Sequence, residues 1–262
     1  RPPRSTQGVS SAASDVYKRQ VISCTKGIKS KPFRTMTDII TEYLGHIVGD
    51  KVGALSGPNL AKEIAEEKVA GTVIALDNQS IANEVKAMLS SNTFKVFSSQ
   101  DMQGVELAGA LKNIYAICCG IAHAKLVGEN ALGFIVTRSM AEMSRFAVAK
   151  GANPITFLGL AGMGDLMATC TSKLSRNFQL GELIAEDLSL LEAKERVGQV
   201  AEGARTLEVV YHEARKMNVS MPLVNSLNEI LYSNASSDQL IQDLLDHPNE
   251  VDVEFTYKEK KL

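Results

Sequence analysis

The 262-residue chain changes its pattern near residue 99. Before that point, short apolar segments rich in β-branched residues alternate with amphipathic segments. Strands are expected over residues 21–27, 52–58, 71–77 and 93–99, with helices over 35–46, 59–70 and 81–91 between them. Strands that alternate with helices of about ten residues predict a parallel sheet covered by helices, and uninterrupted apolar strands fit burial on both faces.

After Asp101 the strand patterns stop and only helical spacing follows. Helices are expected over residues 101–125, 130–150, 154–160, 175–186, 204–217, 222–233 and 237–246, and Pro222 occupies a position where a helix can begin. The sequence therefore predicts an α/β domain over residues 21–98, an all-α domain over 99–255 and a charged tail over 256–262.

Residues 1–20 continue neither pattern and lack the apolar core of a signal peptide. Residues 10–20 are similar to the adapter or vector read-through found in assembled sequence data. We therefore expect residues 1–20 to be foreign to the fold, with a natural disordered arm as the alternative.

A dinucleotide-binding fold also needs a glycine-rich first turn, usually G-x-G-x-x-G. The sequence contains none, because its nearest cluster, Gly159–Gly164, has the wrong spacing and lies in the helical half. Either the protein is not a dinucleotide enzyme or the chain has lost its N-terminus. The abrupt start of the strand pattern at Val21 favours the loss.

Charge and composition exclude several classes of site. A formal net charge of −2 gives no basic field for nucleic acid, so an anionic ligand would need a few local cations. The four histidines show no metal-ligand spacing, and no apolar run long enough to span a bilayer is evident. We expect the four cysteines to be reduced and buried: Cys24, Cys118, Cys119 and Cys170.

Lys112 is the most informative single residue. Steps of four residues along its apolar helical segment meet Gly104, Ala108, Ala116 and Gly120. A lysine in such a stripe of small residues has room for a ligand, and burial favours the neutral amine that can accept a proton from a secondary alcohol. The alternative is tight helix packing with Lys112 extending to solvent.

Other candidates lie at the ends of strands and at the starts of helices. Lys26 follows a strand at the edge where α/β proteins bind ligands, and the turn at Gly57 and Asn59 lets backbone approach an anion. Asp165 can pair with Lys112 and shares a helical face with Thr169. A surface lysine and ordinary helix caps are the alternatives.

A second set of candidates suits a phosphate or a sugar. Ser175, Arg176 and Asn177 supply a hydroxyl, a guanidinium and an amide in succession at a helix start, which suits a phosphate group. Asn113 can hold Lys112 or a substrate by hydrogen bonds, and Glu202 can accept hydrogen bonds from a sugar or a nicotinamide amide. Helix capping and a helix-start acid are again the alternatives.

Taken in order, several segments resemble the bacterial NAD(P)-dependent glycerol-3-phosphate dehydrogenase family. They are TKG, SGPNLA, ELAGALKNIYAI, GENALGFIVTRSMAEMSR, GLAGMGDLMATC, SRN and GQVAEG, between about residues 21 and 246. The combination of ALKN with GDL, TC and SRN is specific to this family. The resemblance implies an incomplete Rossmann-type parallel sheet, a C-terminal helical domain of the 6-phosphogluconate-dehydrogenase-like type, and NAD or NADP as cofactor.

The resemblance also implies an activity and roles for single residues. It implies an oxidoreductase that interconverts sn-glycerol 3-phosphate and dihydroxyacetone phosphate for phospholipid synthesis, cytoplasmic and homodimeric, with Lys112 as proton acceptor. The implied substrate-binding residues are Lys26, Gly57, Asn59, Lys112, Asn113, Asp165, Thr169, Ser175, Arg176 and Asn177. The implied cofactor-binding residues are Lys26, Ala61, Arg176, Val200 and Glu202.

The chain departs from the family pattern in two places. The glycine fingerprint and the early adenosine-binding residues are absent, and Lys29 stands where the family usually has glutamate. Two alternatives therefore stay open at this point: a related two-domain NAD(P)-dependent hydroxy-acid reductase, and an inactive fragment that lacks the dinucleotide fingerprint.

Overall fold

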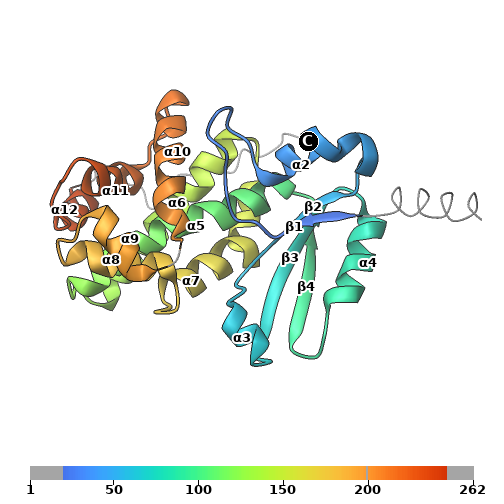
Figure 1. The fold of residues 1–262 in the computed structure, drawn as a ribbon, viewed down its shortest axis with the longest axis horizontal. Helices are drawn as coiled ribbons and strands as arrows, with labels where there is room; N and C mark the ends of the chain where they lie inside the picture. The colour runs from blue at the N-terminus through green and yellow to red at the C-terminus, as the bar shows by residue number, and fades with distance from the viewer. Residues whose placement is uncertain (1–19, 199, 247–262) are drawn as a thin grey trace, which may run out of the picture. The chain divides into compact units, whose positions relative to one another are not determined.

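The computed structural model describes residues 20–198 and 200–246, and the expectation for residues 1–20 therefore lies almost wholly outside the described residues. The chain divides into two compact units (Figure 1). Of the described residues, the sheet unit comprises 20–110 and 151–165, and the helical unit comprises 111–150, 166–198 and 200–246. The sheet unit extends beyond the expected boundary near residue 99, because Val105 and Ala161 pack against Val73 and Ala75.

Within its described residues the sheet unit has the strands β1 (Val21–Ser23), β2 (Val52–Ser56), β3 (Ala70–Leu76) and β4 (Phe94–Ser99), in that order across the sheet. β1 and β2 are parallel, and so are β3 and β4. β2 and β3 are antiparallel, with Ala54 opposite Ala75. The prediction of a wholly parallel sheet is therefore wrong at this central pairing.

The helix between β2 and β3 is shorter than the sequence predicts. A helix was expected over residues 59–70, but α3 covers only Ala61–Ala65, and the chain turns at Glu67, whose φ is 56°. A five-residue helix rises about 7.5 Å, whereas a strand of five to seven residues spans about 17–23 Å. α3 therefore does not carry the chain along the length of a strand, and β3 begins at the end of the sheet where β2 finishes and runs back beside it, with Ser56 opposite Val73.

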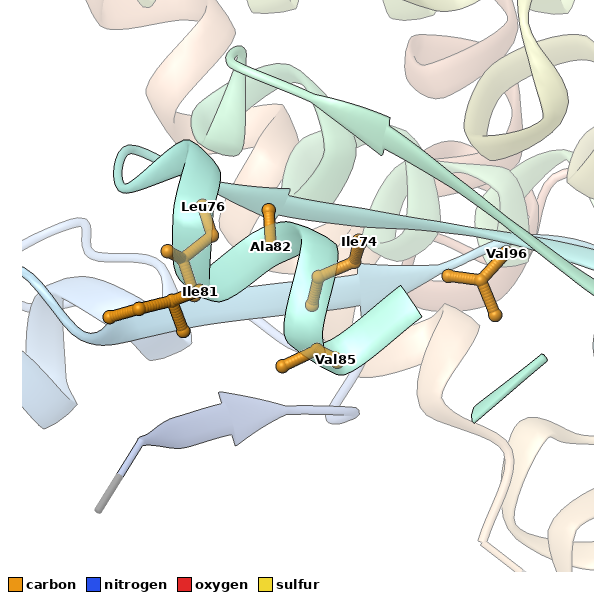
Figure 2. Close-up of a cluster of buried hydrophobic side chains, with 6 residues drawn as sticks. All are labelled: Ile74, Leu76, Ile81, Ala82, Val85 and Val96. Atoms are coloured by element: carbon orange, nitrogen blue, oxygen red, sulfur yellow. The ribbon is translucent and has the colours of Figure 1, made fainter. Parts of the chain in front are cut away.

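Figure 2 shows the core that joins α4 (Gln79–Leu89) to the sheet. Its members come from β3, α4 and β4: Ile74, Leu76, Ile81, Ala82, Val85 and Val96. The side chain of Asn78 caps α4 by accepting from the backbone N–H of Ile81, and α2 (Met36–Val48) begins with a capping box between Thr35 and Asp38. Local caps thus set where these helices begin, and apolar strands set which face they bury.

The remaining elements are helical. They are α5 (Met102–Ala124), α6 (Glu129–Ala149), the 3-10 helix η1 (Pro154–Leu158), the π-helix η2 (Leu160–Gly164), α7 (Asp165–Cys170), α8 (Arg176–Ala185), α9 (Leu190–Val197), α10 (Glu202–Lys216), α11 (Pro222–Tyr232) and α12 (Gln239–Leu245). The α/β-then-helical fold class is confirmed. The sequence analysis missed α9, although Ser189 and Glu192 form a capping box at its start.

α5 corrects one expectation about membranes. By length and composition this helix is apolar enough to cross a membrane, whereas no such segment was noted in the sequence. Its apolar window is entirely buried inside the protein. The core helix of a globular protein has the same length and composition.

The cysteines correct a second expectation. Cys118, Cys119 and Cys170 are buried, but Cys24 is exposed, and all four are free thiols. β1 ends at Ser23, so Cys24 lies beyond the strand that was expected to bury it.

Candidate active site

One group of candidate residues lies at the carboxyl ends of β1 and β2 in the sheet unit. Nζ of Lys26 donates to the carbonyl oxygen of Gly57 at 3.0 Å and forms an ion pair with Oδ2 of Asp165 at 2.5 Å. The Asp165 side chain is buried, whereas that of Lys26 is 24% exposed. Asp165 therefore holds an ammonium group that a ligand in solution can still reach. The pairing of Asp165 with Lys112 stays a prediction.

Two glycines near Lys26 have no room for a side chain. A Cβ at Gly57 would lie 2.9 Å from Cα of Thr72 on β3, closer than real Cβ contacts come. A Cβ at Gly109 of α5 would overlap the hydroxyl oxygen of Ser56 and lie 3.4 Å from Cγ of Lys26. A side chain at either position would push these groups apart.

Two successive hydrogen bonds hold the side chain of Asn59 in place. Its Nδ2 donates to Oγ1 of Thr72 at 2.8 Å, and Thr72 donates to the carbonyl oxygen of Ser56 at 3.1 Å. The buried Oδ1 of Asn59 and Oγ of Ser56 have no hydrogen-bond partner among the described residues. Because buried polar atoms are nearly always hydrogen-bonded, these two atoms suit a polar ligand.

Another group of candidates lies in the helical unit, around Lys112 of α5. Lys112 is only 7% exposed, and its Nζ donates to Oγ1 of Thr169 at 2.5 Å. Thr169, on α7, is buried as well. The alternative in which Lys112 extends to solvent is therefore wrong. A buried amine aligned by a hydroxyl group can accept and return a proton.

Asn113, the residue after Lys112, is hydrogen-bonded to a second buried asparagine, Asn177. Nδ2 of Asn177 donates to Oδ1 of Asn113 at 3.1 Å. The backbone N–H of Gly203, near the start of α10, donates to Oδ1 of Asn177 at 2.9 Å. This chain of hydrogen bonds connects α5, α8 and α10.

Close packing of α5 against α8 brings the asparagines together. A Cβ at Gly120 would overlap the carbonyl oxygen of Phe178, and a Cβ at Gly181 would overlap that of Ile117. The two helices therefore contact each other backbone to backbone. The small-residue stripe expected on α5 serves helix packing at Gly120 and leaves Lys112 buried.

Comparisons with known proteins identify the family. The family model described as NAD-dependent glycerol-3-phosphate dehydrogenase C-terminus matches residues 101–242, and the N-terminus model matches residues 4–82. A curated glycerol-3-phosphate dehydrogenase (NAD(P)+) of Alcanivorax borkumensis is 49% identical over 235 residues, which cover 90% of this chain and 68% of that protein. The chain belongs to the glycerol-3-phosphate dehydrogenase family.

Other similar proteins carry the same family name. The corresponding Pseudomonas syringae enzyme is 46% identical over 237 residues, covering 90% of this chain and 69% of its own length. The crystal structure of glycerol-3-phosphate dehydrogenase from Coxiella burnetii has a TM-score of 0.80 at 31% identity and covers 90% of this chain and 73% of that one. The Saccharomyces cerevisiae enzyme has a TM-score of 0.76 at 26% identity, covering 91% and 73%.

The other candidate residues lie at helix starts. Ser175 caps α8 by accepting a backbone N–H of the first turn. Arg176 is exposed, with no side-chain partner among the described residues. Val200 and Glu202 are exposed at the start of α10, and Ala61 is exposed at the start of α3. Their roles in binding stay predictions.

Thiols near Lys112 remain protonated. The pKa of Cys170 lies well above its ordinary value, because a hydrogen bond with Cys119 and then burial favour the protonated thiol, while the charge of Lys112 acts in the opposite direction. Burial likewise raises the pKa of Cys118. The thiol of Cys170 therefore adds no negative charge beside the amine.

Sequence reasoning missed three residues that shape the site. Thr72 orients Asn59, Gly109 leaves room for Ser56 and Lys26, and Gly203 contacts both asparagines. A signal existed only for Thr72, as a polar residue in an otherwise apolar strand. A glycine inside a helix indicates close approach of some other group without saying which one.

Proposed function

We propose that this oxidoreductase interconverts sn-glycerol 3-phosphate and dihydroxyacetone phosphate with NAD or NADP, and that Lys112 is its proton acceptor. The observation that carries the proposal is a buried lysine that donates to Thr169, next to the buried Asn113, in a chain of this family. A neutral amine is a suitable base for a secondary alcohol.

The proton moves between the substrate and Nζ of Lys112. In the oxidative direction the neutral amine removes the proton from the C2 hydroxyl as the C2–O bond becomes a carbonyl. In the reductive direction the ammonium group stabilises the developing alkoxide and returns the proton. The hydroxyl of Thr169 keeps Nζ in one position throughout. NAD(P), when bound, accepts or supplies the hydride at C2.

Cations and amides are assigned to the substrate phosphate and to its carbon chain. Arg176 offers an exposed guanidinium at the start of α8, beside the hydroxyl of Ser175 and the amide of Asn177. The complete proposed set also contains Lys26, Gly57, Asn59, Asn113, Asp165 and Thr169. Holding the phosphate fixes C2 against Lys112, which lowers the entropic cost of the reaction.

The residues assigned to the cofactor fit one part of it. Lys26, Ala61, Arg176, Val200 and Glu202 would hold NAD(P), and the unpartnered oxygens of Ser56 and Asn59 suit the donors of a ribose or of a carboxamide. The glycine-rich turn that binds the pyrophosphate is not in this sequence. No residue of this sequence is therefore assigned to the pyrophosphate.

Replacing Lys112 tests the proposed base. In an enzyme that carries this chain with a complete dinucleotide turn, Lys112→Ala should lower kcat by roughly 10²–10⁴-fold and change the KM for glycerol 3-phosphate far less. Lys125→Ala is the matched control, because Lys125 follows the same helix and pairs with Asp238. An unchanged kcat in Lys112→Ala would refute the role.

The phosphate requirement tests the substrate class. Steady-state rates with glycerol 3-phosphate are compared with rates for glycerol and for short hydroxy acids without a phosphate. Turnover should require the phosphate group. Equal kcat/KM for an unphosphorylated hydroxy acid would instead identify a related hydroxy-acid reductase.

We also propose a cytoplasmic homodimer that supplies glycerol 3-phosphate for phospholipid synthesis, with a small molecule as substrate and neither nucleic acid nor membrane as partner. The family resemblance supports this proposal. Light scattering of the purified enzyme tests the dimer, and a monomeric mass at micromolar concentration would contradict it.

A further inference from the structure

We propose that Asn177 is a positioning residue that ties the start of α10 to the Lys112 turn of α5, so that a ligand held beside Arg176 also steadies Val200 and Glu202. The inference rests on the proposed function for the identity of that ligand. The link itself rests on contacts within the helical unit.

The first step is a helix start without its own cap. The N-cap of α10 is Ala201, which has no side-chain oxygen to accept a backbone N–H of the first turn. Oδ1 of Asn177 on α8 accepts the N–H of Gly203 at 2.9 Å instead. Asn177 thus supplies from a distant helix the acceptor that serine or aspartate supplies locally elsewhere.

The second step is the orientation of two amides. Because Oδ1 of Asn177 accepts from Gly203, its Nδ2 faces Asn113 and donates to Oδ1 there at 3.1 Å. Asn113 then has its N–H groups available for another acceptor. Donors beside Lys112 suit a phosphate or an alkoxide oxygen, so Asn177 makes Asn113 a donor.

The third step is the packing that makes the link stiff. A Cβ at Gly203 would overlap the carbonyl oxygen of Asn113 and lie 2.8 Å from Oδ1 of Asn177 and 2.9 Å from Cδ1 of Ile117. The start of α10 therefore lies against the backbone of α5 directly after Lys112. A movement of α10 away from α8 would break the hydrogen bond between Gly203 and Asn177.

Hydrogen–deuterium exchange of this 262-residue chain, analysed by peptide, tests the link without requiring turnover. Asn177→Leu should speed exchange of residues 201–206 by about fivefold, the size of a lost helix cap. Asn177→Asp keeps an acceptor for Gly203 and should restore protection there. Unchanged exchange of residues 201–206 in Asn177→Leu would overturn the positioning role.

A pair of glycine variants provides a second test that leaves Asn177 in place. Gly203→Ala should deprotect residues 201–206 as Asn177→Leu does, because the methyl group has no space. Gly133→Ala in α6 is the matched control, since no atom lies within 4 Å of its Cβ position. Equal protection of residues 201–206 in Gly203→Ala and in Gly133→Ala would contradict the close packing of Gly203 against α5.

Ligand protection separates this inference from the proposed function. Millimolar sn-glycerol 3-phosphate should protect residues 175–178 and residues 201–206 together in the wild-type chain, and neither segment in Asn177→Leu. Protection of 175–178 alone would overturn the coupling. Protection of neither in the wild type, with the Asn177→Leu effect still present, would refute the ligand assignment and leave the positioning role intact.

Discussion

The two candidate lysines, one in each unit, differ in their surroundings. Lys26 in the sheet unit stays 24% exposed and is ion-paired with the buried Asp165. Lys112 in the helical unit is only 7% exposed and donates to the hydroxyl of Thr169. A partly solvated, paired ammonium group suits the attraction of an anion, whereas burial weakens the preference of an amine for its charged form. The same residue type therefore suits binding in one unit and proton transfer in the other.

Replacing each lysine by arginine should give the largest difference in kcat between the two positions. Arginine keeps a positive charge but cannot release its proton at neutral pH. Lys112→Arg should lower kcat by roughly 10³-fold, whereas Lys26→Arg should change kcat by less than about tenfold and act mainly on KM. Steady-state kinetics of both variants provide the measurement. Equal losses of kcat would contradict separate roles of the two lysines in binding and in proton transfer.

One buried carboxylate in each unit has a raised pKa for the same physical reason. Burial raises the pKa of Glu106 in the sheet unit, although Thr37 donates two hydrogen bonds to it. Burial raises the pKa of Glu142 in the helical unit to about 7, although Leu223 and Tyr115 donate to it. Desolvation outweighs the hydrogen bonds at both glutamates.

Glu142 should make stability depend on pH. Because its folded-state pKa of about 7 lies above the ordinary value of 4.5, the native protein keeps a proton that the unfolded chain releases in this window. The free energy of unfolding should therefore fall between about pH 4.5 and pH 7, by on the order of 3 kcal/mol.

Urea unfolding of wild type and of Glu142→Gln at several pH values measures this effect. The amide does not titrate, so Glu142→Gln should lose that part of the pH dependence. Glu129→Gln, at the exposed start of the same helix α6, is the control. The same pH dependence in Glu142→Gln as in wild type would rule out Glu142 as its source.

Loss of the Thr169 hydroxyl should have a smaller effect. Thr169→Val removes the acceptor for Nζ of Lys112 and should lower kcat by about tenfold, the worth of one hydrogen bond of about 1.4 kcal/mol. Thr169→Ser keeps the hydroxyl and should recover most of the rate. A Thr169→Ser variant as slow as Thr169→Val would assign the residue to packing instead.

The smallest expected effect concerns helix caps. Asn78 caps α4 in the sheet unit from the adjoining position, whereas α10 of the helical unit takes its cap from Asn177. Asn78→Ala should cost about 1 kcal/mol of unfolding free energy and leave kcat unchanged. A loss of activity in this variant, measured with stability by urea unfolding, would contradict a purely local role.

Much of the fold could be predicted because its signals are local. The helix ending before Gly151, the helix starting at Pro222 and the strands near Val52 and Phe94 lie within a few residues of the expected positions. The direction of β3 was missed, because it depends on how far α3 extends, and apolar spacing suggested a longer helix. α9 was missed because it has only eight residues and is mostly polar, although it begins with a capping signal.

For the site, the sequence by itself determined the residue types: a lysine in an apolar helix, an acid after paired glycines, and a hydroxyl, guanidinium and amide in succession. These residue types can be recognised within single segments of the sequence. The resemblance to a family then connected the segments. Only the tertiary structure decided the partners: Asp165 with Lys26, Thr169 with Lys112, and Asn177 with both Asn113 and Gly203. Hydrogen bonds require atoms within about 3 Å, and the close packing that brings distant segments so near depends on the whole core.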